Sequence, residues 1–427
     1  MTGQESLDYL YGLQKFGIKL GLENIRTFLS RLDHPENRFK SVLVAGTNGK
    51  GSIASALAGI LRDSGFRTGL YTSPHLHVFN ERIRVNGEMI PDDRIARLVA
   101  RLRTRTGSIP ITFFEFTTAL ALEFFAEQEV EVAVLEVGLG GRFDATNAIA
   151  PVLSVVAPVA RDHQQYLGED LDSIAREKAG IMRGGVPVVS APQVIEVEEA
   201  LLDEAKKVGT EISFCGKSFH FDDAGETFDY RGIKETIAGI RPGIPGRHQF
   251  ANMATALAAA EMLQPAGYDL PAIALRSGVE KMFWPGRLEW LAKRSILLDG
   301  AHNGAAANVL ARYLEQQDLV NVHWIVGLKA DKNSEEVLIP LLPACAALYC
   351  VEPPVEEAKP TAELVAIAER HGVRAASFAS IEAALDAVQA AAADSEIVLV
   401  AGSLFLVAAV REIILQEEGR RCDEQVS

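Results

Sequence analysis

The stretch SVLVAGTNGKGS, residues 41–52, decides the fold of this chain. It opens with an apolar run, Val42 to Ala45, which predicts a short buried strand. Three glycines follow, and they let backbone N–H groups approach an anion without an intervening side chain. The residues behind them predict a helix whose apolar face consists of Ile53, Leu57, Ile60 and Leu61. With the charge of Lys50 and the N–H groups of a helix N-terminus, the stretch predicts a phosphate-binding loop.

The spacing of this loop departs from the standard Walker A pattern G-x-x-x-x-G-K-[ST], because Gly51 separates Lys50 from Ser52. The alternative to a phosphate site is a glycine-rich turn with a solvated lysine. That alternative leaves the density of special residues unexplained. We therefore predict a nucleoside triphosphate site here.

Composition limits the classes of protein to consider. The chain has 427 residues, 48% of them hydrophobic and 23% charged, which indicates a soluble globular protein of two or three domains. A net charge of -15 without a long basic run argues against nucleic acid as a partner. Four cysteines without zinc or disulfide spacing favour a reducing compartment. No leader is recognisable, and the longest apolar run, 397–410, is too short for a bilayer, so we predict a cytoplasmic protein without a membrane partner.

Polar residues follow two further predicted strands. The strand Thr68 to Tyr71 leads into Ser73-Pro74-His75, which fits either a ligand-binding edge or a stiff turn. The strand 130–137 ends at Glu136 and is followed by glycines. P-loop enzymes hold magnesium from such a position, so we prefer a metal ligand over a surface charge for Glu136.

One lysine lies where a charge is costly. A predicted helix carries Lys178 on the same face as Leu171, Ile174, Ala175 and Met182. Lys178 should therefore be paired, neutralised or chemically modified, unless it snorkels to the surface. His163, in the loop before this helix, is a ligand candidate only by position.

Strands that alternate with helices predict the fold class, an α/β protein with a P-loop-type doubly wound parallel sheet. Residues 1–284 form the first predicted domain, with a small β excursion around 219–237. Proline and glycine in Phe283 to Arg287 indicate a hinge, residues 285–294. Residues 295–427 predict a smaller Rossmann-like α/β domain, because the strand and helix pattern restarts there.

Nine motifs in one order carry a resemblance that covers nearly the whole chain. They are GTNGKGS (46–52), SPHL (73–76), NERI (80–83), EVGLGGRFDATN (136–147), DHQQYLG (162–168), EKAGI (177–181), PGRHQFAN (245–252), PGR (285–287) and LDGAHN (298–303). Together they resemble the folylpolyglutamate synthase and dihydrofolate synthase family of the Mur ligases. The FFE stretch and DATN favour a bacterial bifunctional member.

The resemblance implies an ATP-dependent ligase that joins L-glutamate to dihydropteroate, to a reduced folate such as tetrahydrofolate, or to both, through an acyl phosphate. It implies ATP as co-substrate, two Mg²⁺ ions as cofactors, K⁺ as a further candidate, and a monomer. The implied ATP contacts are Thr47, Asn48, Gly49, Lys50, Gly51, Ser52, Asn252, Arg287 and Asp299. The implied metal ligands are Ser73, Glu136 and His163. The implied pterin or folate contacts are Thr112, Phe113, Phe114, Glu115, Phe143, Asp144 and Ala145.

Three residues are implied to act in the reaction, Lys50, Lys178 and His302, with Lys178 as a carbamylated lysine. Two alternatives stay open. A peptidoglycan Mur ligase would carry a nucleotide-sugar domain upstream, for which about forty residues leave no room. A P-loop ATPase that acts as a switch or partner-binding module would need neither a pterin nor glutamate.

Overall fold

The computed structural model describes residues 3–17, 19, 21–291, 295–393 and 396–426, with side chains as far as residue 417. The chain forms two compact units. One contains the residues up to 160, 164–243 and 249–282, and the other contains 161–163, 244–248 and the residues from 283 onward. The predicted boundary at 284 and hinge at 285–294 stay predictions, and residues 292–294 of that hinge lie outside the described residues.

An eight-stranded sheet forms the centre of the first unit. Its order is β4 (Glu88–Met89), β3 (Ile83–Val85), β2 (Thr68–Tyr71), β5 (Val132–Glu136), β1 (Lys40–Ala45), β6 (Leu153–Val156), β7 (Val188–Ser190) and β8 (Ile212–Phe214). Six neighbouring strands run parallel to one another, in the order β2, β5, β1, β6, β7 and β8. The strands β3 and β4 add an antiparallel edge beside β2. The predicted parallel sheet is confirmed, with the carboxyl end of β5 beside that of β1, because Val44 pairs with Glu136.

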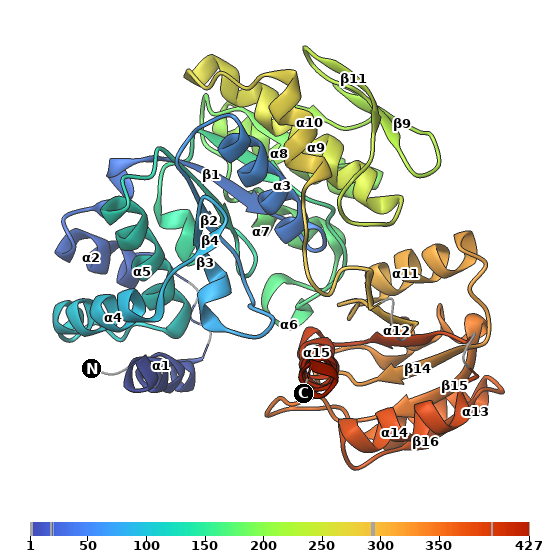
Figure 1. Ribbon diagram of the computed structural model, residues 1–427. Coiled ribbons are helices and arrows are strands. Elements are labelled where there is room, and N and C mark those ends of the chain that lie inside the picture. The colour runs from blue at the N-terminus through green and yellow to red at the C-terminus, as the bar shows by residue number, and fades with distance from the viewer. Residues whose placement is uncertain (1–2, 18, 20, 292–294, 394–395, 427) are drawn as a thin grey trace. The chain divides into compact units, whose positions relative to one another are not determined.

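Helices cover both faces of this sheet (Figure 1). Leu43 and Ala45 of β1 face a core formed with α1 (Gly3–Gly12), α2 (Glu23–Arg31), α4 (Asp92–Thr106) and α5 (Phe113–Glu127). Alternation along the strand turns Val42 and Val44 to the opposite face. The remaining helices of this unit are α3 (Lys50–Asp63), α6 (Gln164–Leu167), α7 (Leu171–Ala179), α8 (Ile195–Val208), α9 (His248–Leu263) and α10 (Ala272–Glu280).

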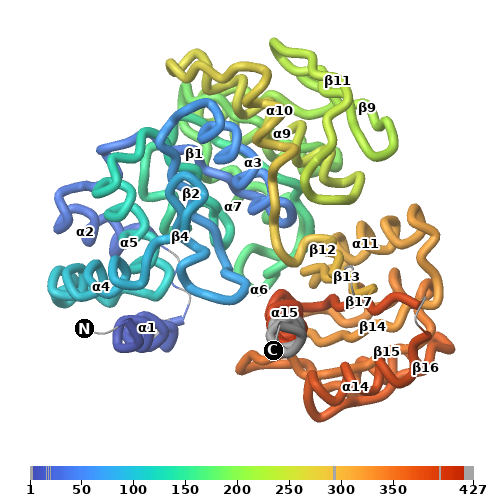
Figure 2. Tube along the Cα trace, in the orientation of Figure 1, coloured from blue at the N-terminus to red at the C-terminus, as the bar shows by residue number. Residues whose placement is uncertain are grey.

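A separate three-stranded antiparallel sheet confirms the predicted β excursion. It consists of β9 (His220–Asp223), β10 (Phe228–Arg231) and β11 (Thr236–Ile240), and it lies at the edge of the first unit (Figure 2). The buried carboxylate of Glu261 in α9 accepts hydrogen bonds from the backbone N–H groups of Ile233 (2.7 Å), Lys234 (3.2 Å) and Glu235 (2.8 Å). These bonds fix the turn between β10 and β11 to the helix that also carries Asn252.

A six-stranded sheet forms the centre of the second unit. Its order is β12 (Glu289–Leu291), β13 (Ile296–Leu298), β17 (Val398–Ala401), β14 (Val322–Val326), β15 (Cys345–Cys350) and β16 (Arg374–Ser377). All strands are parallel except β12, a three-residue strand that lies in the predicted hinge and was not predicted. The helices are α11 (Gly304–Gln316), α12 (Ser334–Leu338), α13 (Thr361–Arg370), α14 (Ile381–Ala391) and α15 (Leu404–Val426). Trp324 of β14 is fully buried in this core.

Short 3₁₀ helices complete the chain. They are η1 (Leu13–Phe16), η2 (Pro35–Arg38), η3 (Phe79–Arg82), η4 (Ala145–Ala148), η5 (Gln264–Ala266) and η7 (Leu342–Ala344). Two of them, η3 and η4, lie in motifs of the sequence, NERI and DATN.

The close approach of α3 to α10 gives a test of the fold. A Cβ atom on Gly278 would lie 2.4 Å from the backbone N of Ile60 and 2.6 Å from its Cα, so neither helix can yield locally. We expect Gly278→Ala to lower the free energy of unfolding by about 1–3 kcal/mol in urea titrations. Gly12→Ala is the control, because no atom lies within 4 Å of its added Cβ. Equal stability of the two variants would contradict this packing.

Candidate functional site

The phosphate loop joins β1 to α3 as predicted. Gly49 is the N-cap of α3 and has φ 83°, a left-handed conformation that favours glycine. Ile53 N–H is bonded to Gly49 O, so the N–H groups of residues 50–52 have no acceptor within the helix. The helix dipole adds to their attraction for an anion. The apolar face predicted for this helix is fully buried.

The front of the loop is bonded to the segment that follows β6. The backbone N–H groups of Thr47 and Asn48 donate to Pro158 O at 2.9 and 3.2 Å. The hydroxyl of Thr47 donates to Ala160 O (2.9 Å) and accepts from Ala160 N–H (3.0 Å). These two residues therefore shape the loop, and their role as ATP contacts, like that of residues 49–52, stays a prediction. Lys50 Nζ donates to Thr47 O at 3.0 Å.

Lys178 reaches the same loop from α7. Its side chain is buried, and its Nζ donates to Gly46 O at 2.8 Å. The predicted burial of Lys178 is confirmed, and the Gly46 carbonyl is one partner of its ammonium group. Met182, placed on the same helix by the sequence, is buried beyond the end of α7.

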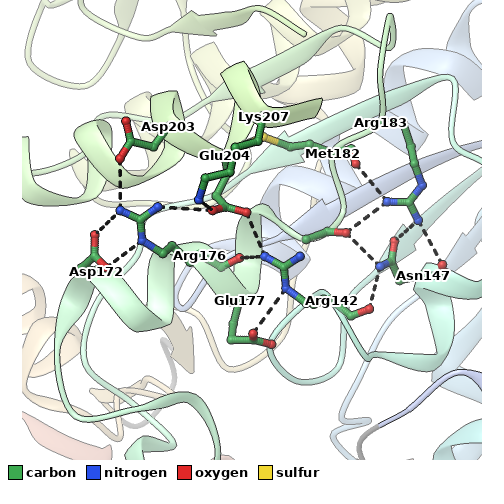
Figure 3. Close-up of polar contacts among 11 residues, drawn as sticks. Arg142, Asn147, Asp172, Arg176, Glu177, Met182, Arg183, Asp203, Glu204 and Lys207 are labelled. Atoms are coloured by element: carbon green, nitrogen blue, oxygen red, sulfur yellow. Dashed lines mark hydrogen bonds and ion pairs between the residues drawn. The ribbon is translucent and has the colours of Figure 1, made fainter. Parts of the chain in front are cut away.

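The glycine-rich loop after β5 packs directly on the last turn of α7 (Figure 3). A Cβ atom on Gly141 would lie 2.8 Å from Lys178 O and 3.0 Å from its Cα. Asn147 Nδ2 donates to Arg142 O (2.9 Å) and to Gly180 O (3.0 Å), and Arg142 N–H donates to Glu177 O (2.9 Å). The loop thus donates hydrogen bonds to carbonyl groups at the end of α7, where a helix leaves carbonyls without an intrahelical donor. The motif DATN therefore fixes the backbone that carries Lys178.

A network of charges joins the same loop to α8 (Figure 3). The carboxylate of Glu204 accepts from Arg142 Nη2 (2.9 Å), Arg176 Nη1 (3.2 Å) and Lys207 Nζ (2.6 Å). Although burial opposes it, these three cations lower the pKa of Glu204 to about 2. Arg176 also pairs with Asp172 and Asp203.

Two of the three predicted metal ligands lie together in the first unit. Glu136 is the last residue of β5 and is buried, and its Oε2 accepts from Ser73 N–H at 3.1 Å. His163, the third predicted ligand, groups with the second unit. Within the described part of the chain, no cluster of three or more His, Cys, Asp or Glu side chains could hold a metal ion. A divalent cation at Glu136 would need further oxygen ligands, such as the phosphates of a nucleotide.

The predicted pterin contacts before α5 have a clear structural role as well. Thr112 is the N-cap of α5, and its hydroxyl accepts from Glu115 N–H at 3.3 Å. Glu115 Oε2 accepts in turn from Thr112 N–H (2.8 Å) and from the Thr112 hydroxyl (2.9 Å). T-F-F-E is thus a capping box, a signal that the sequence carried and that we did not use. It leaves Phe113 and Phe114 half-buried at the start of the helix.

The second predicted set, residues 143–145, lies in the glycine-rich loop. Phe143 is exposed and Ala145 is buried. The buried carboxylate of Asp144 accepts from the backbone N–H groups of Gly138 (3.0 Å), Leu139 (2.9 Å) and Thr146 (3.0 Å) and from the Thr146 hydroxyl. Burial raises the pKa of Asp144. With four donors on two oxygens, its side chain holds the loop in shape.

Asn252 lies against the phosphate loop. It belongs to the first turns of α9, and its Oδ1 would lie 2.6 Å from a Cβ atom on Gly49. Gly49 is therefore required both by its positive φ and by the approach of Asn252. Asn252 Nδ2 donates to Gln249 Oε1 at 2.9 Å.

The second unit brings together the other predicted nucleotide contacts. Asp299 follows β13 and accepts from the N–H groups of Leu288 and Ala301, each at 2.9 Å. Burial raises the pKa of Asp299, and the charge of Arg287 opposes this. An added Cβ on Gly300 would lie 2.3 Å from Arg287 Nη1, so Arg287 lies directly over this turn. His302 Nδ1 contacts Gly300 O at 2.8 Å.

Asp162 and Lys332 form a buried ion pair in the second unit that we did not predict. Lys332 Nζ lies 2.5 Å from Asp162 Oδ1, and Asn303 Nδ2 donates to Oδ2 at 3.1 Å. Burial of Asp162 opposes its ionisation. The hydrogen bond with His302 and the charges of His302, His163 and Lys332 outweigh this effect and hold the pKa of Asp162 far below its usual range. Burial lowers the pKa of His163 to about 4. The motif DHQQYLG contained Asp162, whereas nothing marked Lys332 in the sequence.

Comparisons with known proteins agree with this geometry. Residues 44–260 match the Mur ligase middle domain, and residues 290–413 match the dihydrofolate synthetase C-terminal domain. The chain is 34% identical to the dihydrofolate synthase/folylpolyglutamate synthase of Escherichia coli, over 96% of this chain and 94% of the relative. It is 35% identical to a probable bifunctional folylpolyglutamate synthase/dihydropteroate synthase of Haloferax volcanii, of which it spans 50%.

Solved structures resemble the whole chain. E. coli FolC in complex with DHPP and ADP matches with a TM-score of 0.88 and 32% identity, over 97% of this chain and 98% of the other. The bifunctional folylpolyglutamate synthase/dihydrofolate synthase of Yersinia pestis, complexed with AMPPNP and Mn ion, matches with a TM-score of 0.87 and 32% identity over the same shares. Of the helices described, none combines the length and apolar character that a membrane span requires.

The Glu204 network predicts how stability depends on pH. A carboxyl group whose pKa is lowered by folding stabilises the protein above its unfolded pKa, near 4.3, and loses that effect as the pH falls towards its folded pKa. The folded pKa is about 2, so wild type should lose stability between about pH 4.5 and pH 2. Glu204→Gln should lose less over this range, measured by urea unfolding at each pH.

Asp203→Asn is the matched control, because Asp203 shares Arg176 with Glu204 but its side chain is 64% exposed. It should follow wild type, since water screens exposed ion pairs. A Glu204→Gln profile parallel to wild type would contradict the role of this network.

Proposed function

This chain belongs to the folylpolyglutamate synthase and dihydrofolate synthase family of the Mur ligases, and on that premise we propose that it joins L-glutamate to dihydropteroate, to tetrahydrofolate, or to both. The family consists of ATP-dependent ligases, and the chain is an enzyme of this class. The proposal includes formation of an acyl phosphate and release of ADP and phosphate.

One observation carries the proposal. The buried Lys178 donates a hydrogen bond to Gly46 O of the phosphate loop. The loop that packs on the end of α7 and positions Lys178 begins directly after Glu136. The proposed nucleotide loop and the candidate metal carboxylate thus follow neighbouring strands of one sheet, and the buried lysine is bonded to that loop. A simple P-loop switch does not require the lysine. A ligase must bring two anions together before they react, and a carbamylated lysine would add a carboxylate ligand for the metal ion that offsets their charge.

The residues of the first unit fit a nucleotide-bound divalent cation. Mg²⁺ is commonly held by one or two carboxylates together with substrate phosphates, and Glu136 with Ser73 supplies such a partial set. The ion would supply charge stabilisation to the phosphoryl group. The relative from Y. pestis was solved with AMPPNP and Mn ion, which supports ATP and a divalent metal here. We propose two Mg²⁺ ions, with His163 as a further ligand.

The roles of this chain's own residues follow from their places. The N–H groups of residues 49–52 bind phosphate oxygens, and Lys50 offsets their charge. The substrate carboxylate attacks the γ-phosphorus, and the amine of glutamate then displaces phosphate from the acyl carbon. We propose that Lys178 acts as a carbamylated lysine, which replaces a buried cation by a carboxylate beside the metal. Asn252, Arg287 and Asp299 are proposed to contact ATP, with His302 beside the nucleotide.

The proposed pterin or folate contacts are residues 112–115 and 143–145. Because the side chains of Glu115 and Asp144 are bonded within the protein, we assign recognition to the backbone and to Phe113, Phe114 and Phe143. The solved relative with DHPP and ADP supports a small-molecule substrate. The domain boundaries, a cytoplasmic location, a monomeric state, the absence of nucleic acid and K⁺ dependence stay predictions.

Phosphate release tests the function. With ATP and Mg²⁺ present, we expect turnover only when L-glutamate is supplied together with dihydropteroate or tetrahydrofolate. Omission of either partner should lower the rate to the background level, because the amide cannot form. Parallel assays with dihydropteroate and with tetrahydrofolate show which of the two substrates the enzyme uses. Turnover that ignores both substrates would contradict the ligase and favour a P-loop ATPase.

Lys178→Ala tests the modified lysine. We expect loss of at least about 100-fold in turnover, because a carboxylate beside the nucleotide is lost. A small carboxylic acid such as formate or acetate should restore part of the rate by entering the vacated space. Lys207→Ala, which removes an exposed lysine from the nearby ion network, is the control and should keep its rate. Full activity of Lys178→Ala without added acid would contradict the assignment.

A further inference from the structure

Arg82 is a buried cation whose guanidinium group has no anionic partner among the described residues. Its exposed fraction is 7%, and it ends η3, directly before β3. Three lysine or arginine side chains are buried to this degree among the described residues. Lys178 is bonded to Gly46 O, and Lys332 is paired with Asp162. Arg82 is the third, and no carboxylate lies within 4 Å of it in the described part of the chain.

The Nε atom of Arg82 has a hydrogen-bond partner, whereas its two terminal nitrogens have none among the described residues. Nε donates to His75 Nδ1 at 2.7 Å, and we find no acceptor for Nη1 or Nη2 among the described residues. The adjacent carboxylate of Glu81 accepts instead from the N–H groups of Leu76, His77 and Val78. Burial lowers the pKa of Arg82, as expected for a cation without a close counter-ion. A buried charge of this kind is costly unless a partner completes it.

The position of Arg82 indicates what the partner is. Its Cζ lies 5.4 Å from the ring centroid of Phe113, in the proposed pterin site, and 6.0 Å from that of Phe79. Its carbonyl accepts from Thr72 N–H, next to Ser73. The charge of Glu136 also acts on Arg82. The guanidinium group of Arg82 therefore lies beside Phe113, which we assign to the pterin, and its backbone is bonded next to Ser73, which we assign to the metal.

We propose that Arg82 binds the carboxylate of the pteroyl substrate, the group that the enzyme activates. The inference rests on the proposed function and extends it to a residue that recognises one functional group. A guanidinium fork matches a carboxylate with two parallel hydrogen bonds and offsets its negative charge, whereas the acceptor edge of a pterin, O4 with N5, is neutral. By offsetting the charge of the carboxylate, Arg82 also lowers its repulsion from the γ-phosphate.

Binding of two probes to the full chain tests this. Pteroate contains the pterin ring and a p-aminobenzoate group that ends in the carboxylate, and 6-hydroxymethylpterin contains the pterin ring without that group. In calorimetric titrations with ADP and Mg²⁺ present, Arg82→Met should weaken pteroate binding roughly 10- to 100-fold, while the affinity for 6-hydroxymethylpterin should stay within about twofold. Arg82→Lys should keep part of the affinity for pteroate, because it retains the charge but loses the fork.

Arg84→Met is the matched control. Arg84 lies two residues further along and donates to Glu81 O, so its loss should leave both affinities unchanged. Thermal unfolding establishes that each variant is folded, and if Arg82→Met is not, Arg82→Lys carries the comparison. Equal weakening of both probes would overturn the proposal, since Arg82 would then recognise the ring or shape the loop. Unchanged pteroate binding would overturn it too.

The proposed function can be judged separately. If wild type forms the amide and Arg82→Met binds pteroate normally, only the assignment of Arg82 fails. If wild type neither binds pteroate nor turns over with glutamate, the proposed function fails, and the assignment falls with it.

Discussion

The hydrogen bond from Lys178 Nζ to Gly46 O is the constraint on which the candidate site depends. A buried ammonium group must keep a polar partner, and here the partner is the first carbonyl of the phosphate loop. The lysine can reach it only if the last turn of α7 lies against the loop after β5. Gly141 and Gly180 permit that approach, because a Cβ atom on either would overlap the other segment. The glycines of GLGG and KAG are thus explained by packing rather than by loop flexibility.

Acidic side chains order the loops around this contact. Glu81 collects three backbone N–H groups, Asp144 collects three and a hydroxyl, and Asp299 collects two. In each loop the carboxylate accepts from backbone N–H groups that would be bonded to carbonyl groups in a helix or sheet. A loop ordered in this way can present N–H groups and aromatic rings at fixed positions without being part of the sheet. This explains why the acids Glu81 and Asp144 shape the loops of the candidate site.

The sequence predicted the elements with strong periodicity and left the polar contacts open. The strands β1, β2 and β5, the helix after the phosphate loop and the burial of Lys178 follow from apolar spacing. The partners of the acids do not, because a carboxylate that binds a ligand and one that binds backbone N–H groups look alike in a sequence. Thr112 and Glu115 were an exception, since the capping-box spacing could have been recognised. Lys332 carried no signal, because its partner Asp162 is 170 positions away in the chain.

Buried cations offer a more general way to read such a protein than its acids do. An acid in a loop finds donors locally, because every non-proline residue brings an N–H group. A buried lysine or arginine needs an acceptor with enough charge or several lone pairs, and these are scarce in an interior. Lys332 takes a carboxylate and Lys178 takes a carbonyl at the end of the phosphate loop. For Arg82, His75 Nδ1 accepts from Nε and the aromatic rings of Phe79 and Phe113 supply only weak stabilisation, so we propose that the acceptor for its terminal nitrogens comes from the substrate. An acid substrate that binds beside those rings provides it.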